Sequence, residues 1–273
     1  MSASVFPALI LDDWRTTRDA LHDYARVLGY FRREFTPPQK HWWHITLSVS
    51  ARGLTTTPIP SGSGAVELTL DPSQHRVEVI FSDGRAESIP LRGQSASELD
   101  NAIADALQND GLQPLSSAKF AETAYDYDRA AASRYWSALV AVDLAFKEFK
   151  GTLREETGPV HLFPHHFDLS LNWFSGRRVP GVDPADAENA DEQMNFGFVT
   201  GDGSFAEAYF YATAYPVPEG LTNGDLPEEA HWHTEGFTGA VMPYAAIAGA
   251  QAGRARLLDF LCAAQQAGAE KMR

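Results

Sequence analysis

Apolar residues recur at helical spacing in both halves of the chain. The segment DDWRTTRDALHDYARVLGYFRRE carries such a stripe from Trp14, and SRYWSALVAVDLAFKEFKG carries another from Trp136. Two further helices are predicted in SASELDNAIADALQNDG, with Ser97 as the N-cap and Gly111 as the stop, and in GAQAGRARLLDFLCAAQQAG. Each half therefore contains two predicted helices.

Alternation of apolar and polar residues predicts strands between these helices. The first half alternates from His44 to Ser50 and again in VELTLDPSQHRVEVIFSDGRAESIPL, where turns at Asp71 and Asp83 predict a hairpin. The second half alternates in VHLFPHHFDLSLNWF, EQMNFGFV, EAYFYATAY and HTEGFTGAV. The predicted fold class is α+β, with antiparallel sheets backed by helices.

The two halves match under a single shift of 122 residues. This shift aligns Trp14 with Trp136 and His44 with His166 without gaps. We therefore predict two similar fused halves, an internal pseudo-repeat of about 12–112 and 130–268, within a single globular unit that spans 1–273.

Each half is predicted to carry a polar stripe on one face of a strand, because side chains alternate between the faces. In the first half the stripe begins at His44, and its neighbouring strands carry mixed charges that are typical of a solvated face. In the second half the face carries uncharged amides, phenols and imidazoles. Such groups suit a concave ligand site, and a polar core network is the alternative.

Two histidine–carboxylate pairs mark this second face. His166 with Asp168, and His233 with Glu235, stand two residues apart and would share a strand face. Two imidazoles and a carboxylate can hold Fe(II) or Zn(II), so His166, Asp168 and His233 are candidate ligands of a divalent metal. The same four residues could instead act without a metal, as imidazoles oriented by carboxylates for acid–base catalysis.

Five further residues are predicted to bind the substrate on the second half. They are Asn172, Asn195, Tyr209, Tyr211 and Arg177. Arg177 could clamp an anion, or it could pair with the acidic segment DPADAENADE that follows it. These residues favour an enzyme that acts on a small polar or aromatic molecule, and the alternative is a small-ligand-binding protein without chemistry.

Charge excludes some partners. The chain has 22 basic and 36 acidic residues, a net charge of −14, which disfavours nucleic acid and anionic membranes as partners. The first residues show no basic region followed by an apolar run, so we expect a cytoplasmic location. The lone cysteine, Cys262, lies in LLDFLCAA, where we expect a small buried side chain.

Several of these segments together resemble a known family. HWWHITLSVSARGLTTTPIP, HHFDLSLNWFSGR, DEQMNFGF, EAYFYATAYP and WHTEGFTGAV are similar to the recurrent motifs of a bacterial family catalogued as a domain of unknown function. The resemblance covers nearly the whole chain. It implies one unit of this length and assigns no catalytic role to any residue.

Overall fold

The structure, a computed structural model, describes residues 6–62, 64–112 and 119–272, and it contains two compact units. Unit 2 comprises Asp12–Trp136 and His161–Phe167. Unit 1 comprises the described residues up to Leu11, Ser137–Val160, and the chain from Asp168 onward. These units interleave along the sequence, and the duplication is not confirmed.

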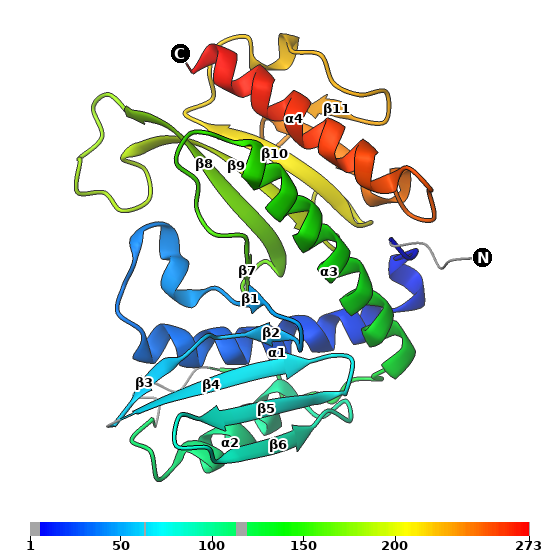
Figure 1. Cartoon of the computed structure of the whole chain (residues 1–273). Helices are drawn as coiled ribbons and strands as arrows, with labels where there is room; N and C mark the ends of the chain where they lie inside the picture. The colour runs from blue at the N-terminus through cyan, green and yellow to red at the C-terminus, as the bar shows by residue number, and fades with distance from the viewer. Residues whose placement is uncertain (1–5, 63, 113–118, 273) are drawn as a thin grey trace. The chain divides into compact units, whose positions relative to one another are not determined.

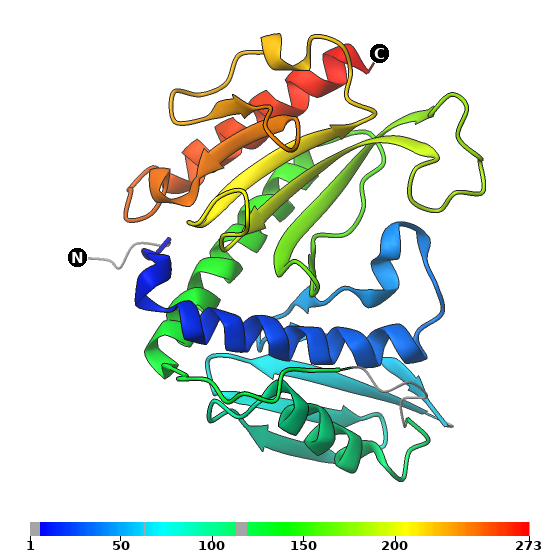
Figure 2. The same cartoon turned by 180° about the vertical axis from the view of Figure 1, so that it is seen from behind.

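Unit 2 is a six-stranded antiparallel sheet with two helices on one face (Figures 1 and 2). The strands follow the order β1-β2-β4-β5-β6, and β3 also pairs with β4. The apolar stripe of the first helix packs there, since Leu21 and Leu28 are fully buried, as are Leu68 and Val79 of the sheet. The elements are α1 (Arg15–Phe35), η2 (Lys40–Ile45), β1 (Ser48–Val49), β2 (Leu54–Thr55), β3 (Ile59–Ser61), β4 (Gly64–Asp71), β5 (Arg76–Phe81), β6 (Ala86–Pro90), α2 (Ala96–Leu107) and β7 (His161–Phe163).

The start of α2 differs from the prediction by two residues. Ser95, rather than Ser97, is the N-cap, and its hydroxyl accepts a hydrogen bond from the Glu98 backbone at 3.1 Å. The Glu98 carboxylate in turn accepts from the Ser95 backbone at 2.8 Å. This reciprocal capping box satisfies two N–H groups at once, whereas a cap at Ser97 would place no Glu three residues later.

Unit 1 is an antiparallel sheet covered on one face by two helices (Figure 1). Its strands follow the order β11-β12-β10-β9-β8. Phe146 and Phe149 of the longer helix contact Phe210 and Phe196 of the sheet, with ring centroids 6.5 and 5.0 Å apart. The elements are α3 (Arg129–Thr152), which enters unit 1 at Ser137, β8 (Asp168–Arg178), β9 (Asp191–Val199), β10 (Tyr209–Tyr215), β11 (His231–His233), β12 (Gly239–Pro243) and α4 (Gly253–Lys271), with the short helices η1 (Leu11–Asp13), η3 (Leu221–Asn223) and η4 (Tyr244–Ala246).

The strand predicted from His44 to Ser50 is wrong over its first half. His41 and Trp42 have φ angles of 52° and 59°, a left-handed conformation that turns the chain, and η2 then continues to Ile45. Only Ser48 and Val49 form a strand. His44 therefore lies in a 3₁₀ helix and does not head a strand.

His166 does not head a strand either. It lies in a turn, and Phe167 has a φ angle of 57°, so the backbone reverses its course before β8 begins at Asp168. Left-handed backbone interrupts the two-residue repeat of a strand, and His166 and Asp168 therefore do not share a strand face. The expected equivalence of His44 and His166 as strand starts is not what the structure shows.

Three single-residue expectations have clear outcomes. Trp14 and Trp136 are buried, at 4% and 8% exposure, as their positions in the apolar stripes predict. Cys262 is exposed on α4, which corrects the expectation of a buried side chain. The buried stripe of α4 runs through Leu257, Leu261 and Ala264. Cys262 follows Leu261 directly, so the helical turn of about 100° per residue carries it off this stripe.

Candidate functional site

The face of the unit 1 sheet away from the helices is crossed by the side chain of Tyr211. Gly197 of β9 lies between Tyr211 of β10 and Ser170 of β8 in the strand register. A Cβ atom at Gly197 would overlap three atoms of the Tyr211 side chain, so the phenol ring lies directly over this glycine. The Tyr211 hydroxyl thereby reaches β8 and donates to Asp168 Oδ2 at 2.6 Å.

Other polar residues of this face also bond to one another. The Ser170 hydroxyl donates to Asn195 Oδ1 at 2.6 Å, and the Asn172 amide donates to Gln193 Oε1 at 3.0 Å. Ser170 and Asn172 are buried, at 0% and 7% exposure. The polar stripe predicted as a ligand site is thus occupied by an internal hydrogen-bonded network, which was the alternative interpretation.

Burial sets the protonation of both tyrosines on this face. The pKa of Tyr211 is raised far above its ordinary value, mainly by burial and then by the charge and hydrogen bond of Asp168. The pKa of Tyr209 is raised by burial and by its 2.6 Å hydrogen bond to Asp202. Each phenol therefore stays protonated and donates a hydrogen bond to the neighbouring carboxyl oxygen.

The second histidine pair lies at the far edge of the sheet. His233, on β11, packs between the rings of Phe205 and Phe237, with centroid distances of 5.0 and 4.6 Å. A ring nitrogen of His233 is 2.5 Å from the backbone oxygen of Glu235, whose side chain is exposed in the bend after β11. The Glu235 carboxylate therefore does not orient the imidazole.

His166 belongs to unit 2, and within unit 1 the structure does not bring Asp168 and His233 together, which corrects the predicted convergence. Asp168 on β8 and His233 on β11 are separated by β9, β10 and β12. Four strand spacings amount to about 19 Å, whereas metal ligands lie about 2.0 to 2.2 Å from the ion. Within the part of the chain that the structure describes, no three His, Cys, Asp or Glu residues are grouped so that they could hold a metal ion.

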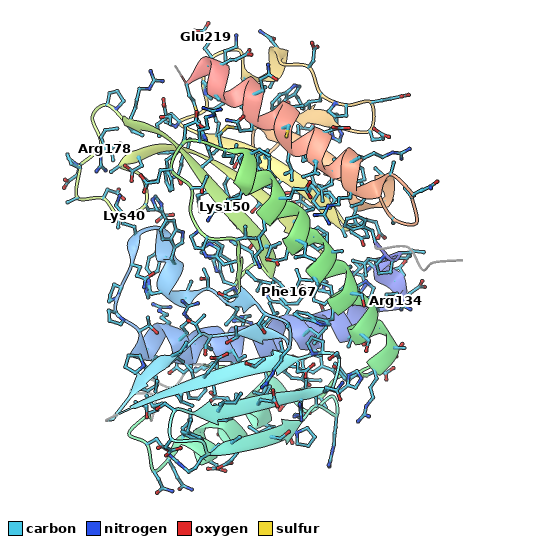
Figure 3. The ribbon with its side chains drawn as sticks, in the orientation of Figure 1. Lys40, Arg134, Lys150, Phe167, Arg178 and Glu219 are labelled. Atoms are coloured by element: carbon cyan, nitrogen blue, oxygen red, sulfur yellow. The ribbon has the colours of Figure 1, made fainter. Side chains whose placement is uncertain are left out.

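The arginines after β8 pair with the acidic segment. Arg177 contacts both carboxylate oxygens of Glu192, at 3.0 and 3.2 Å. Arg178 lies at the hairpin between β8 and β9 (Figure 3), where it forms an ion pair with Asp191 at 2.8 Å. The interpretation of Arg177 as a partner of DPADAENADE is confirmed, and both guanidinium groups already have carboxylate partners.

A pocket of about 300 Å³ lies beside α1 in unit 2, and we call it the α1 pocket. One face of the helix lines it with Arg26, Gly29, Tyr30 and Arg33, which follow the spacing of residues that share a helical face. A Cβ atom at Gly29 would lie 2.6 Å from Cγ of Pro164. The missing side chain of Gly29 therefore lets Pro164 rest against the helix backbone.

Both flanks of the α1 pocket come from segments remote in sequence. Pro164 and His165 follow β7, and Lys119 and Phe120 belong to the segment that precedes α3. The rings of Tyr30 and Phe120 meet edge to face, with centroids 5.6 Å apart. The pKa of His165 falls to about 4, because of burial and then the neighbouring His166 and His22, so its imidazole is neutral at pH 7.

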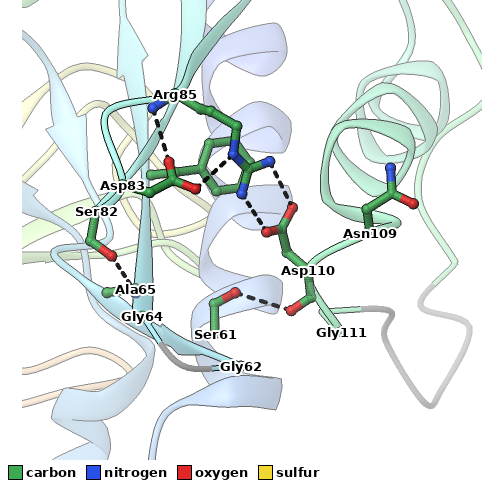
Figure 4. Close-up of a pocket in the computed structure, with 11 residues that line it drawn as sticks. Ser61, Gly62, Gly64, Ala65, Ser82, Asp83, Arg85, Asn109, Asp110 and Gly111 are labelled. Atoms are coloured by element: carbon green, nitrogen blue, oxygen red, sulfur yellow. Dashed lines mark hydrogen bonds and ion pairs between the residues drawn. The ribbon is translucent and has the colours of Figure 1, made fainter.

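A second pocket of unit 2, of about 510 Å³, is polar and its charges are paired (Figure 4). Arg85 donates to Asp83 at 2.8 Å and to Asp110 at 2.6 Å, and its guanidinium carbon lies 4.0 Å from the ring centre of Phe81. The hydroxyl of Ser61 donates to the Asp110 backbone at 3.0 Å. The single cation of the described pocket lining is thus held by two carboxylates.

Comparison with known families matches the sequence of this chain to one family. The sequence profile of a family of unknown function, DUF5996, matches residues 6–273. The chain belongs to DUF5996. No curated protein and no solved structure matches the chain. Among the described helices of this DUF5996 protein, none is long and apolar enough to cross a membrane.

The α1 pocket of this DUF5996 protein was missed by sequence reasoning. One signal was available, because Arg26, Gly29 and Arg33 stand at spacings of three and four on a helix that was correctly predicted. The contributions of Lys119 and Pro164 carry no such signal, since they reach α1 only through the tertiary fold. The sequence pointed instead to alternating polar residues, which the structure places in the network of unit 1.

Proposed function

We propose that this protein binds a small anionic molecule in the α1 pocket and does not convert it. The supporting observation is the charge of the pocket. Arg26, Arg33 and Lys119 line it, and the described lining contains no aspartate or glutamate. Three cations gathered in a chain of net charge −14 create a local positive field that would attract an anion.

Two of the three cations have no carboxylate partner among the described residues. Arg26 forms an ion pair with Asp23 at 2.8 Å. Arg33 and Lys119 have no ion pair with any residue of the ranges that the structure describes. An arginine offers a planar pair of N–H donors that matches a carboxylate or a phosphate, and a lysine adds a mobile charge. Arg33 and Lys119 would therefore carry the recognition.

The neutral state of His165 supports the same assignment. With a pKa of about 4, its imidazole has one donor and one acceptor nitrogen at pH 7 and adds no charge. It could orient a ligand by a hydrogen bond without adding to the charge of the pocket.

The alternative is an enzyme that uses the histidines and carboxylates predicted from the sequence. Its proposed residues are His166, Asp168, His233 and Glu235, and this assignment stays a prediction. For such an enzyme, Tyr211 and Asn195 would have to exchange their hydrogen bonds to Asp168 and Ser170 for bonds to a substrate. Binding in the α1 pocket needs no such exchange, because Arg33 and Lys119 have no carboxylate to give up.

The test is calorimetric titration of the full chain with inorganic phosphate, acetate and benzoate at low ionic strength. We expect at least one of the three to bind, and Arg33→Gln or Lys119→Gln to weaken that binding by about tenfold, because each variant loses a charge-assisted hydrogen bond. Added salt should weaken binding as well.

The matched control is Arg92→Gln, which removes the same charge from an exposed residue of unit 2 outside the pocket. Its affinity should equal that of the parent. Absence of binding by all three probes, or equal losses in Arg92→Gln and Arg33→Gln, would contradict the proposal. Recovery of a chemically altered probe after incubation would favour the enzyme.

A further inference from the structure

We infer that the ligand of the α1 pocket is an aromatic acid, a single flat ring that carries a carboxylate. This inference rests on the proposed function and adds the class of ligand to it. It follows from the apolar side chains that line the pocket beside the cations. These are Tyr30, Phe120, Ile45 and Pro164.

Gly29 has no side chain and lines the pocket together with Pro164. Pro164 packs onto the helix at that point, and a Cβ atom on Gly29 would lie 2.6 and 2.9 Å from two of its ring carbons. The same Cβ atom would lie 3.3 Å from the backbone oxygen of Ile45. A proline ring laid against a bare helix backbone presents a smooth apolar surface rather than a set of projecting side chains.

Aromatic rings form one flank of the pocket. Tyr30 follows Gly29 on α1, and the ring of Phe120 meets it at 79°. Two rings in this orientation offer both a ring face and a ring edge to a ligand. An aromatic ligand can stack on the face in an offset geometry or meet the edge, the two arrangements that aromatic pairs prefer. A saturated ring of the same size has no such preference.

The charges are placed to hold the acidic group of such a ligand. Arg33 lies one helical turn beyond Gly29 on the same face, about 6 Å along the axis. A ring that lies against Pro164 beside Gly29 would therefore place its carboxylate near Arg33. Arg26 lies about one turn before Gly29. Its ion pair with Asp23 screens its charge, so Arg26 would contribute mainly the apolar part of its side chain to the pocket.

The size of the pocket suits a small ligand. Its volume of about 300 Å³ is at the lower end of the range for small-molecule sites, about 300 to 1,000 Å³. A single ring fits this volume, since a cavity of about 150 Å³ already holds benzene. The carboxylate, the flat body and the small volume together define a benzoate-like acid.

The test compares benzoate with cyclohexanecarboxylate, acetate and inorganic phosphate by calorimetric titration of the full chain. Benzoate should bind at least about tenfold more tightly than acetate, because only the ring buries apolar area. It should also bind severalfold more tightly than cyclohexanecarboxylate, which has the same charge and a similar size but is not flat.

The variant Phe120→Leu tests the aromatic flank. It should remove most of the preference for benzoate over cyclohexanecarboxylate. Phe237→Leu, a partly buried aromatic of unit 1, is the matched control and should keep the full preference. The comparison of the four probes on the unmodified chain stands even if a variant folds poorly.

Each outcome separates this inference from the proposed function. Binding of acetate or phosphate as tight as that of benzoate would overturn the aromatic acid and leave the anion site intact. Equal affinities for benzoate and cyclohexanecarboxylate would also overturn it. Absence of binding by all four probes would overturn both.

Discussion

Gly197 should be one of the least replaceable residues of the unit 1 sheet. Its neighbour across the sheet, Tyr211, passes over it to bond Asp168 at 2.6 Å, and a Cβ atom there would overlap the phenol. Gly197→Ala must therefore displace the ring. Overpacking costs about 1 to 3 kcal/mol, and loss of a hydrogen bond to a carboxylate costs about 1.5 to 3 kcal/mol.

The combined loss is roughly 3 to 5 kcal/mol of unfolding free energy. For a chain of this size, each kcal/mol lowers Tm by about 2 to 4 °C, so the expected fall is roughly 6 to 20 °C. Urea unfolding followed by circular dichroism measures the free energy directly. Gly203→Ala is the matched control, because a Cβ atom there meets nothing within 4 Å, and its stability should stay within about 0.5 kcal/mol of the parent.

A double-mutant cycle identifies the cause. In a Tyr211→Ala background the ring is absent, so adding Gly197→Ala should lower the unfolding free energy by no more than about 1 kcal/mol. The packing argument is refuted if Gly197→Ala is as stable as Gly203→Ala, or if its cost is the same with and without the Tyr211 ring.

Further predictions concern stability and pH. Trp14→Ala and Trp136→Ala should each lower the unfolding free energy by about 3 to 5 kcal/mol in urea titrations, since both side chains are buried, and parent-like curves would show that they do not pack. Ser95→Ala should cost about 1 kcal/mol and Ser97→Ala much less, and the reverse order would contradict the cap assignment. His165 has a folded-state pKa of about 4, below its ordinary 6.5, so the unfolded chain takes up the proton first as pH falls. The stability that comes from the neutral His165 is full above pH 6.5 and is lost as pH falls toward 4. In His165→Gln, the unfolding free energy should therefore depend less steeply on pH between 6.5 and 4.

The sequence by itself determined the local elements of this protein. The apolar stripes that begin at Trp14 and Trp136 are helices α1 and α3, and the alternating segments of the second half are strands β8, β9 and β10. These predictions hold because the periods of 3.6 and 2 reflect which side chains must leave water, and this choice depends on neighbours along the chain. The α+β class follows from the same patterns.

The predicted strand starts at His44 and His166 failed because the backbone near them is left-handed, which a pattern of side chains does not reveal. Apolar and polar residues do alternate from His44 to Ser50, but just before this segment His41 and Trp42 adopt left-handed backbone that side-chain polarity does not specify. Phe167 does the same between His166 and Asp168. Such conformations persist in non-glycine residues only where surrounding contacts over-determine them, and those contacts come from elsewhere in the fold.

Only the tertiary structure decided which polar residues meet. Sequence spacing places His233 and Glu235 together, yet strand order puts them four strands from Asp168. It is also strand order that lets Tyr211 reach Asp168 across Gly197. In the same way, Lys119 and Pro164 join Arg33 at one pocket although they are far apart along the chain. Strand order and helix packing depend on the burial of the whole apolar surface at once, and so no local pattern can specify them.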